Sequence, residues 1–141
     1  MKHAKQFYLA YWKQLKFFVD EQGLDWTFSS FEGESQAVVR IGSPKRKICL
    51  SLLDPGSGHI SAGFWIPDSP EEFALLKAGQ AGIEAEMGKP LVWDSKPLRK
   101  SSWVRITAAI DLSHEGNWPE SFEWFARNAQ KIRDVCQRHL G

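Results

Sequence analysis

Cysteine is scarce in this sequence, and the two copies present are isolated. Cys49 and Cys136 each lie within an apolar pattern, and no second cysteine lies near either of them. The sequence therefore indicates neither a disulfide framework nor a zinc site. We predict two reduced thiols in the core or the sheet, and we expect no metal and no cofactor.

Long apolar runs are also missing. No stretch approaches the roughly 18 residues that a membrane-spanning helix needs. Lys5, Lys13, Lys16 and Asp20 interrupt the N-terminal stretch, and the same charges argue against a secretory signal peptide. We therefore expect a cytoplasmic protein that does not interact with a membrane.

An excess of charge of either sign is missing as well. The chain has 18 lysines plus arginines and 17 aspartates plus glutamates, which gives a net charge of +1. This balance produces no general attraction to DNA or to an anionic membrane. Binding to nucleic acid would have to come from a local basic patch.

Repeats, low-complexity tracts and Pro/Ser-rich linkers are absent, so the sequence suggests no domain boundary. Its 141 residues fall in the usual single-domain range, and we predict one domain over residues 1–141. Tryptophan is unusually frequent, with seven copies. Because tryptophan is seldom left in water, these rings are expected in the core, an interface or a binding surface.

Hydrophobic spacing predicts a helix followed by a three-stranded meander. Aromatic and apolar residues recur at helical spacing over residues 4–22, and Gly23 ends the predicted helix. Alternating apolar residues then mark strands over residues 37–41, 48–52 and 60–66. Short turn sequences join these strands, which favours antiparallel pairing. Residues 26–31 fit a loop as well as a strand.

The second half of the chain predicts two more strands between two helices. A capping serine and a proline at residues 69–70 begin one helix, and Gly88 ends it. Strands are predicted over residues 91–93 and 102–110, and a final helix follows Asn117. We therefore predict an α+β, two-layer fold. Its largely antiparallel sheet has about five strands, with three helices packed on one face in the order α-β-β-β-α-β-β-α.

Two basic loops, after the first and fourth predicted strands, are expected at the same end of the sheet. The outer sheet face adds two arginines and two tryptophans, and this mixture of basic and aromatic groups is typical of platforms for single-stranded nucleic acid. The candidate binding residues are therefore Arg40, Lys45, Arg46, Lys47, Trp65, Lys96, Arg99, Lys100, Trp103 and Arg105.

Two interpretations of these residues stay open. Six cations at one rim would suit the phosphates of DNA or RNA. Tryptophan and arginine are also enriched in protein interfaces, so solvated loops beside a homodimer or partner interface explain the same residues. We favour the second interpretation.

One catalytic pattern is present in outline. Pro67-Asp68 followed by Asp94-Ser95-Lys96 fits the proline-aspartate, acid-x-lysine pattern of a large nuclease superfamily. That chemistry needs two carboxylates on a divalent cation, with the lysine near the attacked phosphate. Asp68 instead stands at a predicted helix start, where a carboxylate stabilises the helix dipole. A metal-dependent nuclease is therefore the alternative hypothesis, and we assign no catalytic residue.

Several aromatic and structural motifs also occur together in a known family. They are Trp12, Val39-Arg40-Ile41-Gly42, Phe64-Trp65-Ile66, Ser69-Pro70-Glu71-Glu72, the helix end over residues 83–88, Leu91-Val92-Trp93-Asp94, residues 102–110, and Asn117-Trp118-Pro119-Glu120 with Trp124. Through them the chain resembles a family of uncharacterised prokaryotic and viral domains of similar size, found alone or after a nuclease-like or restriction-associated region. The resemblance implies a domain without an established activity.

These observations together predict a non-catalytic interaction module. We expect a homo-oligomer, or the partner of another protein, DNA or RNA, that serves a nucleic-acid-processing or defence system. A small-ligand sensor is a third possibility, with a pocket between the helices and the sheet lined by some of the tryptophans.

Overall fold

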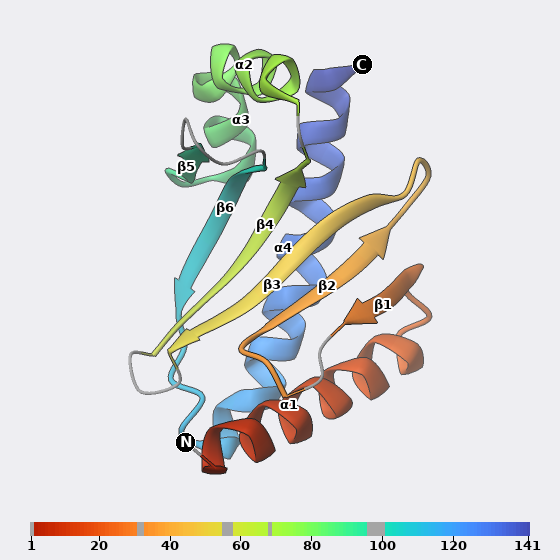
Figure 1. Cartoon of the computed structure of the whole chain (residues 1–141), viewed down its shortest axis with the longest axis vertical. Helices are drawn as coiled ribbons and strands as arrows, with labels where there is room; N and C mark the ends of the chain where they lie inside the picture. The colour runs from red at the N-terminus through yellow and green to blue at the C-terminus, as the bar shows by residue number, and fades with distance from the viewer. Residues whose placement is uncertain (1, 31–32, 55–57, 68, 96–100) are drawn as a thin grey trace.

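The described residues form a six-stranded antiparallel sheet with four α-helices on one of its faces. The structure is a computed structural model, and it describes residues 2–30, 33–54, 58–67, 69–95 and 101–141. Figure 1 shows α4 running along the back of the sheet, with α1 towards one end and α2 and α3 towards the other. The elements in chain order are α1 (Lys2–Glu21), β1 (Trp26–Ser30), β2 (Gln36–Ile41), β3 (Arg46–Asp54), β4 (His59–Ile66), α2 (Pro70–Ala78), α3 (Gln80–Met87), β5 (Val92–Ser95), β6 (Ser102–Ala109), the 3₁₀ turn η1 (Glu115–Asn117) and α4 (Trp118–Leu140).

The strands lie in the order β1-β2-β3-β4-β6-β5, and each neighbouring pair is antiparallel. The three-stranded meander predicted from the sequence corresponds to β2, β3 and β4. The helical connection after β4 leads to β5, which pairs with β6 rather than with β4. The α+β class and the antiparallel sheet are therefore confirmed.

The predicted number of strands was too low, because residues 26–30 form a strand. β1 pairs with β2 along the edge of the sheet, with Trp26 opposite Ile41. The strand is only five residues long, and its register shifts between Phe28 and Ser30. A strand this short and irregular carries too few alternating positions to be separated from a loop by pattern alone.

The predicted number of helices was also too low, because the helix expected over residues 69–88 is two helices. The expected start is present, since the Ser69 hydroxyl accepts a hydrogen bond from the Glu72 backbone N–H at 3.3 Å. The chain then leaves helical geometry at Gly79, which ends α2 and begins α3. The apolar positions continue across this break, so their spacing suggested one helix.

Aromatic side chains fill the space between α1 and α4. The Tyr11 ring lies within 5.2 Å of the ring centroids of Trp12, Trp118 and Phe122. The Tyr11 hydroxyl is hydrogen-bonded to the Ser121 hydroxyl at 2.6 Å, and burial raises its pKa. The indole N–H groups of Trp12 and Trp118 donate to backbone carbonyls, each at 2.8 Å. These two tryptophans are therefore core residues with satisfied polar atoms.

The face of the sheet that points away from α4 is the outer face. Successive side chains of a strand point to opposite faces, so the apolar residues that meet α4 alternate with a second, more polar set. No helix among the described residues covers this set (Figure 1). None of those helices is long and apolar enough to cross a membrane. The outer face includes Gln36, Val38, Arg40, Lys47, Cys49, Ser51, Ser61, Gly63, Trp65, Val92, Asp94, Trp103, Arg105 and Thr107.

Candidate binding surface

Two tryptophans and a lysine form a stack across three strands of the outer face. Trp65 of β4 and Trp103 of β6 are cross-strand partners, and their ring centroids are 5.7 Å apart at an interplanar angle of 20°. The Lys47 ammonium of β3 lies 4.3 Å from the Trp65 ring centroid. Because β4 lies between β3 and β6, the ammonium and the second indole flank Trp65 from opposite sides.

This stack limits what the aromatic rings can bind. Stacking of a nucleobase requires an open ring face. Both sides of Trp65 are occupied within the domain, and one side of Trp103 is occupied by Trp65. The stack is better suited to contact a partner through a rigid surface, which consists of the two indole rings and the aliphatic part of the lysine side chain.

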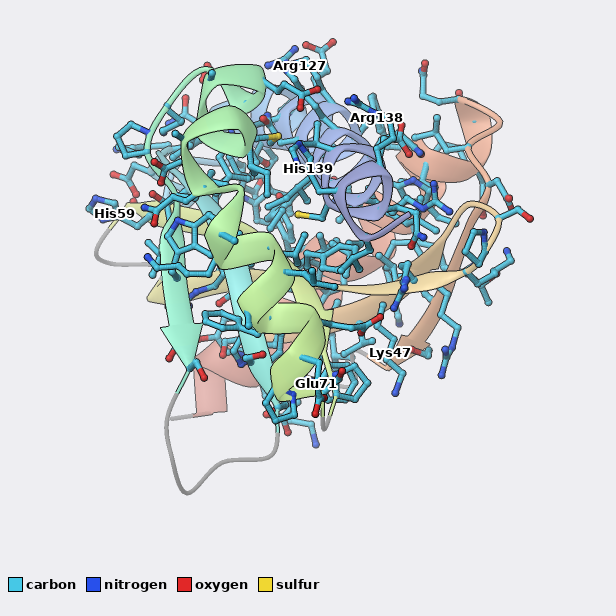
Figure 2. The ribbon with its side chains drawn as sticks, turned by 90° about the horizontal axis from the view of Figure 1, so that it is seen from above. Lys47, His59, Glu71, Arg127, Arg138 and His139 are labelled. Carbon is cyan, nitrogen blue, oxygen red and sulfur yellow. The ribbon has the colours of Figure 1, made fainter. Side chains whose placement is uncertain are left out.

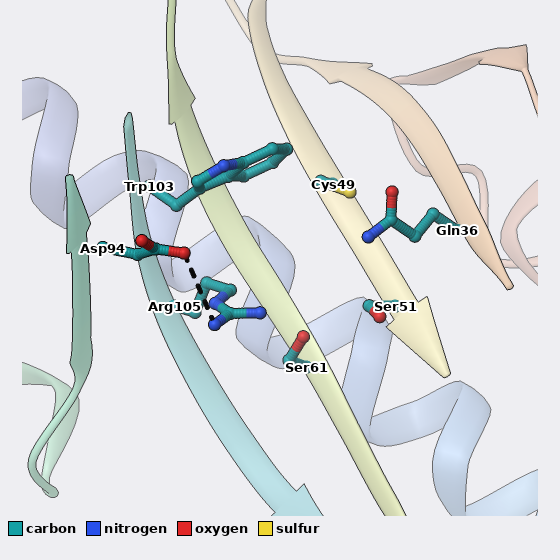
Figure 3. A pocket seen from close by; sticks show the side chains of 7 residues that line it. All are labelled: Gln36, Cys49, Ser51, Ser61, Asp94, Trp103 and Arg105. Atoms are coloured by element: carbon teal, nitrogen blue, oxygen red, sulfur yellow. Dashed lines mark ion pairs between the residues drawn. The ribbon is translucent and has the colours of Figure 1, made fainter. Parts of the chain in front are cut away.

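A small pocket of about 210 Å³ opens beside the stack (Figure 3). The cross-strand register explains its position. The stack forms a row of large side chains, and the next two rows hold Cys49 with Gly63 and Ser51 with Ser61. Small residues beside large ones leave a depression. The lining residues are Gln36, Cys49, Ser51, Ser61, Asp94, Trp103 and Arg105.

Arg105 reaches into this pocket because its cross-strand neighbour is a glycine. A Cβ atom at Gly63 would lie 2.8 Å from the Arg105 Cγ. Any larger residue would therefore displace the arginine side chain from its path across β4. The guanidinium Nη2 lies 3.8 Å from an Asp94 carboxylate oxygen, which is an ion pair beyond hydrogen-bond distance (Figure 3).

Within the part of the chain that the structure describes, three buried polar atoms on the outer face have no hydrogen-bond partner. They are Ser61 Oγ, Trp65 Nε1 and Arg105 Nε, and Trp26 Nε1 is the one other such atom among the described side chains. Ser61 is fully buried and is one of the residues that line the pocket. A buried donor without a partner costs roughly 1–3 kcal/mol, so native proteins seldom keep one without a reason.

Cys49 does not supply a nucleophile to the pocket. Burial raises the pKa of its thiol to about 11, although the nearby Arg105 charge lowers it in part. The thiol is therefore protonated at neutral pH, and a protonated thiol is a poor nucleophile.

The predicted basic rim is partly neutralised within the domain. Lys45 pairs with Asp25 at 3.0 Å. Arg46 lies opposite Ile41 in the register and points to the helices, where its Nε donates to Gln137 Oε1 at 2.6 Å and its Nη2 pairs with Glu72 at 3.3 Å.

Two other predicted cations, Arg40 and Lys47, lie on the outer face. Arg40 is exposed on the outer face, and its register partner is Lys47. Lys47 lies on the side of the sheet away from α4, which carries Arg127, Arg138 and His139 (Figure 2). The remaining predicted residues, Lys96, Arg99 and Lys100, fall outside the described residues.

Comparison with known proteins places the chain in a family. The model of a domain of unknown function, DUF4268, matches residues 7–140. The chain belongs to the DUF4268 family. A family of unknown function agrees with the resemblance seen in the sequence, whereas the prokaryotic and viral distribution and the nuclease-like neighbours stay predictions.

A solved structure with a different sequence has a fold similar to that of this DUF4268 domain. The crystal structure of YbjN from E. coli, described as a candidate transcription regulator, matches with a TM-score of 0.53 and 18% sequence identity. The match covers 88% of this chain and 87% of that chain. At this identity the likeness concerns the fold alone. No curated protein matches the DUF4268 chain.

The sequence did not point to most of the pocket of this DUF4268 domain. Trp103 and Arg105 were predicted binding residues, but Gln36, Cys49, Ser51 and Ser61 were not. Alternation along the strands places all of them on the outer face. What alternation does not provide is the register between strands, which brings the small residues side by side.

The nuclease pattern stays a prediction in this DUF4268 domain. Asp94 lies on the outer face beside Arg105, and Asp68 and Lys96 fall outside the described residues. The described part of the chain contains no group of three or more histidine, cysteine, aspartate or glutamate residues that could hold a metal ion.

Two glutamates of α3 join it to its neighbours. Glu84 accepts hydrogen bonds from the Leu91 backbone N–H at 2.9 Å and from the Trp93 indole at 3.0 Å, and these bonds lower its pKa. Glu86 contacts His139 and Arg138 at the end of α4, and the His139 hydrogen bond is the main cause of its lowered pKa. Both glutamates therefore have structural partners.

Proposed function

We propose that this domain is a non-catalytic interaction module that binds another protein chain through its outer face. The stack of Lys47, Trp65 and Trp103 is the observation that supports this proposal most directly. It is an aromatic and basic surface on a rigid sheet, left uncovered by the helices among the described residues. Rigid aromatic side chains contribute much of the binding energy of protein interfaces.

The charges favour a protein over a nucleic acid as the partner. A surface that holds phosphates needs cations that are free to contact them. Lys45 and Arg46 are paired with acids of the same domain, and Arg105 lies beside Asp94. The aromatic rings likewise offer little open area for stacked bases.

A second copy of this chain is the partner that we propose first. The biological setting that we propose is a nucleic-acid-processing or defence system, as the family resemblance suggests. YbjN, whose fold is similar, is itself described as a candidate transcription regulator. That description is compatible with an interaction module near nucleic acid.

Sedimentation velocity over a wide range of concentrations tests the proposal. We expect reversible self-association that Trp103→Ala weakens about 30-fold, as for an interface residue worth about 2 kcal/mol. Phe17→Ala is the control, because Phe17 is 66% exposed on α1 and lies away from the outer face. A chain that stays monomeric at all concentrations would contradict the homodimer.

Fluorescence anisotropy with labelled DNA and RNA tests the choice of partner class. We expect no binding at low salt. Binding that weakens steeply with salt, and that is lost in Arg40→Gln and Lys47→Gln, would overturn the choice of a protein partner.

A further inference from the structure

The pocket on the outer face contains donors that call for a ligand with acceptor oxygens. Ser61 and Arg105 line it, and Ser61 Oγ and Arg105 Nε are buried without a hydrogen-bond partner among the described residues. A guanidinium and a neighbouring hydroxyl suit the two oxygens of a carboxylate, because a charged acceptor gives shorter and stronger hydrogen bonds than a neutral one.

The pocket also contains a negative charge, which a simple carboxylate ligand would not match. The Asp94 carboxylate lies 3.8 Å from the Arg105 guanidinium. A carboxylate has two oxygens that can each accept more than one hydrogen bond, so Asp94 can contact a ligand while it pairs with Arg105. Trp103 lines the same pocket, and the face of an indole attracts a cation.

We propose that this pocket binds a free α-amino acid as its zwitterion. The ligand carboxylate accepts hydrogen bonds from Arg105 Nε and Ser61 Oγ. The ligand ammonium lies against Asp94 and the Trp103 ring. Asp94 and Arg105 lie side by side in the pocket (Figure 3), so their opposite charges face the adjacent opposite charges of the ligand.

Size and charge both favour this class of ligand. The volume of about 210 Å³ is below the roughly 300 Å³ at which pockets for drug-sized ligands begin, which restricts the ligand to a small molecule. Among the described residues that line the pocket, Arg105 and Asp94 carry charges that cancel. A ligand with a single charge would leave one charge in the filled pocket without compensation, and burying an uncompensated charge is costly.

This inference does not depend on the proposed protein interface. The pocket lies next to the stack, but the ligand contacts are complete within one chain. Failure of self-association would leave the amino-acid site untouched, and absence of amino-acid binding would leave the interface untouched.

A titration followed by ¹H–¹⁵N NMR tests the site on the intact chain. The probes are alanine, N-acetylalanine, which lacks the ammonium, and alaninamide, which lacks the carboxylate. We expect saturable shifts of the Arg105 Nε–H signal with alanine, and binding about tenfold weaker or worse for each blocked analogue. Equal binding of alanine and N-acetylalanine would overturn the zwitterion, and no saturable shift with alanine would overturn the site.

Three variants assign the contacts. Ser61→Ala and Asp94→Asn are each expected to weaken alanine binding about tenfold, the first through the ligand carboxylate and the second through its ammonium. Arg40→Gln, on the same face but outside the pocket, is the control and should bind as the unchanged chain does. Unchanged affinity in both pocket variants, with their spectra showing a folded chain, would overturn the assignment.

Discussion

Two fully buried serines provide a direct test of the unpartnered hydroxyl in the pocket. Ser61 and Ser121 are both 0% exposed. The Ser61 hydroxyl has no partner, whereas the Ser121 hydroxyl bonds to the Tyr11 hydroxyl at 2.6 Å and donates to the Trp118 carbonyl at 2.7 Å. Substitution by alanine should therefore raise the free energy of unfolding at Ser61 and lower it at Ser121.

The magnitudes follow from these partners. Ser61→Ala removes a buried polar atom that gains nothing, and we expect the free energy of unfolding to rise by about 1 kcal/mol, or the melting temperature by roughly 4 °C. Ser121→Ala leaves the buried Tyr11 hydroxyl without its partner, which costs about 1–3 kcal/mol. The better helix propensity of alanine returns about 0.5 kcal/mol of this.

Urea denaturation of the two variants and the unchanged chain measures both effects. The slopes with denaturant should be equal, so that the midpoints report stability. Alanine as a ligand should then stabilise the unchanged chain more than Ser61→Ala, because only the unchanged chain has both carboxylate donors. A Ser61→Ala variant destabilised as much as Ser121→Ala would mean that the Ser61 hydroxyl is satisfied in the folded protein, and it would refute the reasoning.

Two further predictions concern contacts away from the pocket. Gly42→Ala should destabilise the domain by roughly 3 kcal/mol in urea denaturation, for two reasons. Gly42 has φ of +78°, which strains any residue with a side chain. An added Cβ would also lie 2.7 Å from the Arg133 guanidinium, which donates hydrogen bonds to the Ile41 and Pro44 carbonyls. Gly23→Ala, with φ of +69° and nothing within 4 Å, is the control and should lose only about 1 kcal/mol. The stability that Glu84 contributes through its lowered pKa should be present above its ordinary carboxyl pKa of 4.5 and decline as the pH falls through the lower folded value. Glu84→Gln should therefore be less stable at neutral pH and show a smaller loss in acid, and an unchanged pH profile of the free energy of unfolding would contradict this.

Local patterns predicted the faces of the strands well. Alternation placed Arg40, Trp65, Trp103 and Arg105 on one face, and the register confirms that they share it. Arg46 shows where the prediction failed in detail. Lys45-Arg46-Lys47 looked like a solvated basic loop, but β3 begins at Arg46, so Arg46 and Lys47 point to opposite faces. Extending the alternation back from the buried Ile48 would have placed Arg46 towards the helices.

Contacts between distant segments could not be read from local patterns. The partners of Arg46 lie in α2 and α4, at Glu72 and Gln137, and no periodicity relates these positions. The pocket depends in the same way on the pairing of β3, β4 and β6, which brings Cys49, Gly63 and Ser61 together. A pocket between the helices and the sheet was the expectation for a ligand sensor. The inner face is instead filled by apolar side chains, and the small residues lie on the outer face.

The two proposals make a joint prediction because stack and pocket share Trp103. If a partner chain packs on the Trp103 ring, it lies beside the mouth of the pocket and changes the affinity of the pocket for an amino acid. Thermodynamic linkage then makes the two effects equal. The factor by which the bound amino acid changes the affinity for the partner chain must equal the factor by which the bound partner chain changes the affinity for the amino acid. Sedimentation in the presence and absence of alanine measures one side of this relation, and NMR titration above and below the association concentration measures the other. Unequal factors would mean that the two events do not belong to one equilibrium. Equal factors different from one would make the outer face a ligand-controlled interface.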